Sequence, residues 1–400
     1  MSPDEPNATV RERPKRLTSL DAYRGLIMVT LAGGGFGLVK MAERFDDRVW
    51  QTLAYHASHA EWISNFRVVC CRYWDLIQPS FMFMVGVAMA YSYARRAREG
   101  QSPVKMTFHA ASRAAVLVLL AIFLSSNGSD HTRFEFFNVL AQIGLGYLFV
   151  YALMWRGLAV QLAAAVVILV GYWALFAYWP VPGPDFDYAA SGIDPDSLLP
   201  GVFVHWSKNV HPAWEFDVWF LNLFPRTEPF EFNEGGYATL NFVPSIVTML
   251  FGVMAGQLLQ GPRGRWTKLF VLVLAGALAL GLGVAASYTV CPIVKRIWTP
   301  AWVLFAGGWT FWILAVLYFV IDVLEWRAWS IPLVMVGMNS ILVYLMAQTM
   351  RPYTAETLKK HFGQEIFAGT YGPVIQSVSV LAVFWLICWW LHRQKVFLRI

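Results

Sequence analysis

Apolar stretches close to the length of a membrane-spanning helix recur along the whole chain. Because about 20 apolar residues are needed to cross a hydrocarbon core about 30 Å thick, each stretch is a candidate transmembrane helix. The pattern predicts an all-α, polytopic integral membrane protein with about 10 transmembrane helices (about 9–11, because the first and fourth stretches are marginal). The predicted helices cover residues 22–40, 76–94, 109–126, 137–155, 158–179, 239–260, 268–288, 301–324, 332–350 and 373–391.

The composition supports this class of protein. Hydrophobic residues make up 57% and charged residues 14% of the chain, and the mean hydropathy is +0.49, whereas soluble domains carry roughly 25% charged residues. The formal net charge of +6 is explained by basic loops on one face of a membrane protein, so no nucleic-acid partner is predicted. The predicted surroundings are membrane lipids.

The loops differ in charge, which predicts how the chain is oriented. With the N-terminus inside, basic residues outnumber acidic ones in the cytoplasmic segments, in agreement with the positive-inside rule. Both termini are therefore predicted to be cytoplasmic. Residues 1–16 are expected to form a flexible tail; the alternative, a cleaved signal peptide, lacks a small-residue cleavage site after the first apolar run. Residues 17–400 are expected to form a single transmembrane domain with outer loops at 41–73 and 180–237.

The first outer loop contains the sequence YHASHAEW at 55–62, which places His56 and His59 three positions apart. A histidine titrates near neutral pH and can act as a base, an acid or a nucleophile. The alternative is an interfacial histidine that is paired with a nearby acid. No third ligand accompanies the two histidines at a helical spacing, so no metal site is predicted.

Two further features of this loop stand out. Asp75 lies at the outer mouth of the second predicted helix, where a carboxylate is unfavourable unless it is partnered or functional. A simple helix-start charge is the alternative. Cys70 and Cys71 are adjacent, and adjacent cysteines seldom satisfy the geometry of a disulfide.

Seven blocks of sequence, in order along the chain, resemble the transmembrane acyltransferases typified by heparan-α-glucosaminide N-acetyltransferase. Together they span nearly the whole membrane domain, which makes the resemblance specific to this family. The blocks are LTSLDAYRGL (17–26), HAEW (59–62), DLIQPSFMFMVG (75–86), NVLAQIGLGYL (138–148), NEGGYATLNFVPSIVTMLFGVMAG (233–256), VKRIWTPAWVL (294–304) and GMNSILVYL (337–345).

The resemblance implies a bacterial inner-membrane acetyltransferase. Acetyl-CoA from the cytosol would be the co-substrate, and an extracytoplasmic amino sugar or glycan would be the acceptor. It also implies that a histidine in the first outer loop is catalytic. In the family this histidine precedes Ala or Val, a variable residue and Trp, so His59 fits the motif and His56 does not.

The remaining candidate residues divide between the acceptor and the donor. Basic groups should hold the CoA phosphates at the cytoplasmic end, where Arg24 and Arg113 are predicted to lie at the inner ends of their helices; a local ion pair of Arg24 with Asp21 is the alternative. Gln142 and Asn339 are amides inside helices and need partners, either a ligand or another helix. The expected acceptor-site residues are Asp75, Trp62, Asn233, Lys295, Trp298 and Asn339, and the expected acetyl-CoA residues are Arg24, Asp21, Arg113 and Gln142.

Two regions allow more than one interpretation. The glycines at 33–35 stand where the animal enzymes carry an asparagine, and they serve either close helix packing or the approach of a slender substrate. In the second outer loop, Trp214, Glu215, Asp217 and Trp219 suit either a sugar site or an amphipathic lid, and the lid is favoured.

Other functions stay open at this point. A transporter of a small solute or glycan precursor is one alternative, although the sequence shows no inverted repeat and no charge pair at mid-membrane. An O-acyltransferase that acts on sugar hydroxyls is another. The oligomeric state is open, with a homodimer as one option.

Overall fold

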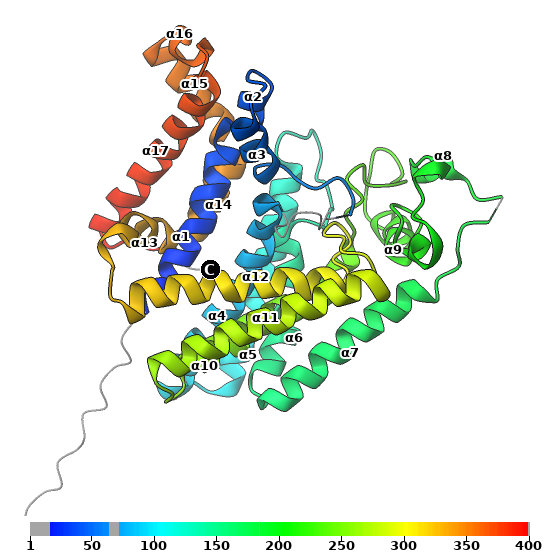
Figure 1. Cartoon of the computed structure of the whole chain (residues 1–400), viewed down its shortest axis with the longest axis horizontal. Coiled ribbons are helices and arrows are strands. Elements are labelled where there is room, and N and C mark those ends of the chain that lie inside the picture. Colours follow the sequence, from blue (N-terminus) through cyan, green and yellow to red (C-terminus); the bar gives the residue numbers. More distant parts are fainter. Residues whose placement is uncertain (1–16, 64–71, 184, 399–400) are drawn as a thin grey trace, which may run out of the picture.

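The computed structural model describes residues 17–63, 72–183 and 185–398, and these residues fold into helices joined by turns and loops, without a strand (Figure 1). The predicted tail at 1–16 and the Cys70–Cys71 pair lie outside the described residues. The elements are α1 (Thr18–Gly33), η1 (Gly34–Gly37), α2 (Leu38–Ala42), α3 (Arg48–His56), η2 (Tyr73–Leu76), α4 (Ile77–Arg98), α5 (Pro103–Ser126), α6 (Val139–Met154), α7 (Leu158–Ala177), α8 (Tyr188–Ser191), η3 (Pro195–Ser197), η4 (Gly201–Trp206), α9 (Pro212–Leu221), η5 (Thr239–Asn241), α10 (Phe242–Gln260), α11 (Arg265–Thr289), α12 (Pro300–Tyr318), η6 (Phe319–Val323), η7 (Ala328–Ser330), α13 (Ile331–Gly337), α14 (Ser340–Thr349), α15 (Arg351–Phe362), α16 (Gln364–Ala368) and α17 (Gly372–Arg393).

Each of the ten predicted apolar stretches is helical, which confirms an all-helical polytopic membrane protein. Within the described residues, eight helices are long and apolar enough to cross a membrane. The ninth predicted stretch is a pair, α13 and α14, bent by 67°. The fourth is α6, whose 16 residues measure about 24 Å and are short for a core about 30 Å thick.

Close helix packing sets the centre of the molecule. A side chain at Gly86 of α4 would collide with the backbone of Met249 in α10, and one at Gly252 would collide with the backbone of Phe83. Glycines therefore let α4 and α10 approach closely, as in other membrane bundles. In Figure 1 α1, α14 and α17 lie together on one side of this centre, and the outer-loop helices α8 and α9 lie near one end of α7.

The outer end of α1 unwinds into a left-handed turn. Gly34, Gly35, Phe36 and Gly37 have φ angles of 53°, 66°, 52° and 70°, a conformation that costs a residue with a side chain roughly 1–2 kcal/mol. The Arg351 guanidinium fills the space beside Gly34 and donates to the Gly33 carbonyl at 3.0 Å. Gly35 lies against Ala57 and Trp74, next to the loop that carries His59. The glycines thus serve the turn and its close protein contacts.

Candidate active site

Three polar side chains from distant parts of the sequence meet at the end of the bundle that carries the loops 41–73 and 180–237. His59 follows α3, Asp75 lies in η2 ahead of α4, and Lys295 lies in the turn between α11 and α12. The His59 Nδ1 atom is 2.7 Å from Asp75 Oδ1, and the Lys295 Nζ atom is 3.1 Å from the same oxygen and 3.2 Å from Nδ1. The structure therefore joins three of the predicted site residues into one cluster.

The Asp75 carboxylate organises this cluster. It is 1% exposed, and its second oxygen accepts the Ala60 backbone N–H at 3.1 Å. An ammonium group and two N–H donors stabilise its ionised form. Since a carboxylate only accepts hydrogen bonds, the short contact places the proton of a neutral His59 ring on Nδ1 and leaves a lone pair on Nε2.

The His59 ring is accessible at the protein surface. Its side chain is 42% exposed, and Nε2 has no hydrogen bond to any residue that the structure describes. An imidazole in this tautomer can accept a proton or attack a carbonyl carbon. His56 is not part of the cluster; its ring instead makes an edge contact with Tyr55, with centroids 5.2 Å apart.

Two arginines hold the backbone around His59. Arg72 Nη1 donates to the His59 carbonyl at 2.6 Å, and its guanidinium lies 4.6 Å from the centre of the Tyr55 ring. Arg296 donates to the Ala60 carbonyl at 3.2 Å and to the Gly235 carbonyl at 2.9 Å. Sequence reasoning missed Arg72 as a site residue, and its place just ahead of the Tyr73–Leu76 turn was the one available signal.

Buried side chains of the bundle hold the turn that carries Lys295 and Arg296. Asn241 donates to the Arg296 carbonyl at 2.7 Å, and Tyr172 donates to the Ile297 carbonyl at 3.1 Å. Trp298 is 1% exposed and donates to Thr248 Oγ1 at 3.2 Å. Trp298 is therefore buried inside the bundle, where it supports the turn that carries Lys295. It does not lie at the exposed side of His59.

Two other expected acceptor residues anchor the second outer loop. Trp62 donates to the Trp206 carbonyl at 2.9 Å and stacks on the His211 ring with centroids 6.5 Å apart. The Asn233 side-chain oxygen accepts the Tyr237 N–H at 3.1 Å. Both side chains already bond to the backbone: Trp62 ties the loop at 180–237 to the His59 segment, and Asn233 holds a turn within that loop.

The two buried amides bind protein groups elsewhere. Asn339 lies at the break between α13 and α14; it donates to the Val396 carbonyl at 3.3 Å and accepts the Leu398 N–H at 2.9 Å. Gln142 accepts the Ser245 hydroxyl at 2.9 Å. The structure does not bring either amide to His59, and for both it shows the partnered arrangement that was the alternative to ligand binding.

Asp21 and Arg24 lie at the other end of α1 from the His59 loop. Their side chains are 3.6 Å apart, and that of Asp21 is buried. Ten residues separate Arg24 from Gly34 at the glycine turn, which is about 15 Å along a helix. These two residues therefore belong to the opposite end of the bundle.

The position predicted for Arg113 is wrong. Helix α5 begins at Pro103, with Ser102 as its N-cap, so Arg113 lies ten residues, or about 15 Å, inside the helix and not at its inner end. Its guanidinium lies 5.5 Å from the centre of the Tyr147 ring. Its Nε atom is buried without a hydrogen-bond partner in the described chain.

Sequence reasoning missed two polar neighbours of Arg113. His109 is one turn earlier on the same face of α5, and its Nε2 atom accepts a hydrogen bond from Arg96 of α4 at 2.8 Å, because a guanidinium group only donates. Arg96 and Arg113 place positive charge among α4, α5 and α6. Charge inside a membrane bundle is unfavourable unless it serves a ligand or a partner.

Helix α9 in the second outer loop has a buried and an exposed side. Asp217 is 1% exposed and accepts the Thr239 N–H at 2.8 Å, and burial raises the pKa of its carboxyl to about 7. His211 accepts the Trp214 N–H as the helix cap at 3.1 Å, and burial lowers its pKa to about 3. Trp219 is 61% exposed. The acid and the tryptophan do not share one sugar-binding face.

The fold and the cluster define a polytopic helical membrane protein with a histidine, a carboxylate and a lysine gathered at one end of its bundle. Among the described residues, no three His, Cys, Asp or Glu side chains are grouped to hold a metal ion. The chain is similar to heparan-alpha-glucosaminide N-acetyltransferase of Mus musculus, with 24% identity over 460 aligned positions that cover 100% of this chain and 63% of the mouse protein. The Homo sapiens protein of the same name is 25% identical over 445 positions, 97% of this chain and 60% of its own length.

These similarities support the family relationship that the sequence blocks predicted. The chain spans about three fifths of the length of these curated relatives. No family model matches it.

Proposed function

We propose that this protein is a transmembrane acetyltransferase of the bacterial inner membrane. It passes the acetyl group of cytosolic acetyl-CoA to an amino sugar or glycan on the extracytoplasmic side, with His59 as the catalytic residue. The observation that carries the proposal is the contact between His59 Nδ1 and the buried Asp75 carboxylate, because it leaves Nε2 basic and accessible. The similarity to named N-acetyltransferases supports the reaction class.

The cluster suits both routes for acetyl transfer. In direct transfer, the acceptor amine attacks the thioester carbon, its proton moves to His59 Nε2, and the C–S bond breaks to release CoA thiolate, which the imidazolium then protonates. In a two-step route, Nε2 attacks the thioester carbon, and the C–S bond breaks to release CoA thiolate and form an acetyl-imidazolium. The amine then attacks the acetyl carbon, the bond from that carbon to Nε2 breaks, and the amine proton passes to the thiolate. The ring becomes positively charged in both routes, and Asp75 stabilises that charge.

The donor requires a second, cationic region. The phosphates of acetyl-CoA are anionic, so they favour guanidinium groups with unused donors. Arg113, with its unpartnered Nε, and the neighbouring Arg96, which donates to His109, supply such a region among α4–α6. Arg24 adds a charge at the end of α1 that lies away from His59. From this region the extended CoA molecule reaches across the bundle, with its thioester toward His59 Nε2.

The test is acetyl transfer from labelled acetyl-CoA by purified protein in liposomes, with glucosamine as the acceptor. The His59→Ala variant is expected to lose about 10²–10⁴-fold in rate, whereas His56→Ala, in the same loop, keeps most of it. Parent protein that neither binds nor hydrolyses acetyl-CoA, together with an unchanged His59→Ala variant, would contradict the proposal. Mass analysis of the product distinguishes an amide from an ester.

A further inference from the structure

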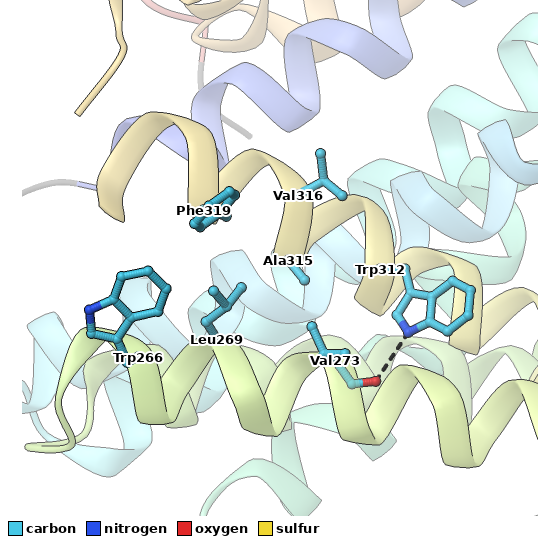
Figure 2. A pocket seen from close by; sticks show the side chains of 7 residues that line it. All are labelled: Trp266, Leu269, Val273, Trp312, Ala315, Val316 and Phe319. Atoms are coloured by element: carbon cyan, nitrogen blue, oxygen red, sulfur yellow. Dashed lines mark hydrogen bonds between the residues drawn. The ribbon is translucent and has the colours of Figure 1, made fainter. Parts of the chain in front are cut away.

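A wholly apolar groove runs between α11 and α12 on the outside of the bundle, away from the His59 cluster. The two helices touch where Gly276 faces Gly308. Beyond that contact the groove encloses about 510 Å³, and Figure 2 shows side chains of both helices along it. The Trp312 indole N–H donates to the Val273 carbonyl at 3.1 Å, so this polar group is already satisfied. The lining consists of Trp266, Leu269, Val273, Trp312, Ala315, Val316 and Phe319.

The length of the groove matches one leaflet of a bilayer. Ten residues of α11 separate Gly276 from Trp266, which is about 15 Å of helix. This is half of a hydrocarbon core about 30 Å thick. Trp266 is 65% exposed at the start of α11, and tryptophan is typical of the level where hydrocarbon meets headgroups. The groove thus runs from an interface to about the middle of the membrane.

The mouth of the groove is basic. Arg263 and Arg265 precede Trp266, Lys268 follows it, and all three lie at the first turn of α11 or just before it. Arg265 pairs with Glu325 at 3.0 Å, and the Lys268 amine donates to the Leu259 carbonyl at 2.7 Å. Arg327 is two residues from Glu325. The basic groups therefore exceed the one exposed acid that pairs with them.

We propose that this groove is a specific site for an anionic phospholipid. One acyl chain lies against the apolar lining, and the phosphate and headgroup lie at Arg263, because Arg265 already pairs with Glu325. The charge of the mouth selects this occupant, because each basic residue near a membrane surface favours an anionic lipid by about 1 kcal/mol, or roughly five-fold. A neutral lipid would fill the same groove without that gain.

Native mass spectrometry of the full chain, purified in detergent and mixed with equal amounts of phosphatidylglycerol and phosphatidylcholine, tests the site. The parent is expected to retain one phosphatidylglycerol about five-fold in preference to phosphatidylcholine. Val273→Trp, which fills the groove, is expected to lose the bound lipid of either kind. Arg263→Gln is expected to keep a bound lipid and to lose most of the preference.

Matched controls use equivalent positions away from the groove. Val166→Trp changes a residue of α7 that is 60% exposed, and Lys105→Gln changes an exposed basic residue in the first turn of α5. Both are expected to bind like the parent. Equal retention of the two lipids by the parent, or full retention by Val273→Trp, would overturn the site. A monomer–dimer change in Val273→Trp alone would instead assign the groove to a second copy and would also overturn it.

Discussion

Two buried aspartates near the His59 end of the bundle have opposite surroundings. Asp75 and Asp217 are each 1% exposed. Asp75 accepts hydrogen bonds from Lys295, His59 and the Ala60 backbone, whereas Asp217 accepts the Thr239 N–H on one oxygen and its other oxygen has no partner within the described chain. Burial alone therefore does not determine the charge of a carboxylate.

The difference identifies which acid can do chemistry at neutral pH. Burial raises the pKa of Asp217 to about 7, and the more distant Arg226 offsets this only in part, so both the charged and the neutral form are populated at neutral pH. The ammonium group of Lys295 lies 3.1 Å from Asp75 and favours the charged form. Asp75 can thus fix the tautomer of His59, and Asp217 serves the packing of α9.

Asp75→Asn tests this distinction with the largest expected effect. The amide oxygen can still face Nδ1, but it carries no charge to stabilise a positive His59 ring, so the acetyl-transfer rate is expected to fall by about 10²–10⁴-fold. The measurement is kcat with labelled acetyl-CoA, and KM for acetyl-CoA should change little. Asp217→Asn is the matched control, since it makes the same change at the same burial. Equal loss in both variants would contradict the assignment.

Lys295→Met tests the pairing through stability. Removing the cation leaves the Asp75 charge buried without its counter-ion, which is expected to destabilise the protein by about 3 kcal/mol. The double variant Asp75→Asn with Lys295→Met removes both charges, so it should recover most of this stability while staying inactive. Thermal unfolding in detergent measures both effects.

An exposed ion pair provides the control for this experiment. Arg95 and Glu99 are 2.6 Å apart with side chains 71% and 48% exposed, and such solvent-screened pairs contribute little to stability. Arg95→Met should therefore unfold close to the parent temperature. If the double variant is less stable than Lys295→Met alone, the two charges do not stabilise each other.

The helices could be predicted from the sequence because their signal is local. Each predicted apolar stretch coincides with a helix, since backbone groups in a bilayer must pair within the segment. The start of α5 was placed six residues late because 103–108 are mixed in polarity, and Pro103 after Ser102 was the better signal. That error moved Arg113 from the interior of the helix to its end.

The site could be predicted only in part, because its contacts join distant segments. His59 and Lys295 are 236 positions apart, and no periodicity shows that they meet. The sequence could name Trp62, Asn233 and Trp298 by chemistry, but it could not show that backbone and hydroxyl groups already occupy their hydrogen-bonding atoms. The type of a residue suggests a role in binding, but its hydrogen-bond partners in the folded protein determine whether it is available for that role.

Asp217 is also expected to make the stability of the protein depend on pH. Its folded pKa, about 7, lies above the ordinary value of 3.8 for an aspartate, so its contribution to stability is complete below that ordinary value and is lost as the pH rises through about 7. Asp217→Asn removes this titration and keeps an oxygen for the Thr239 N–H. The variant is therefore expected to gain stability relative to the parent between pH 4 and 7, by at most about 1.4 kcal/mol per pH unit.

His211, next to α9, titrates in the opposite direction and must be separated from this effect. Its pKa is lowered from 6.5 to about 3, so its contribution is present above pH 6.5 and is lost as the pH falls. Both proteins contain His211, so the unfolding temperature of Asp217→Asn minus that of the parent isolates Asp217. Glu215→Gln, an exposed acid on the same helix, should give a flat difference. A flat difference for Asp217→Asn as well would mean that Asp217 is as well stabilised in its charged form as Asp75, and the contrast between the two aspartates would fail.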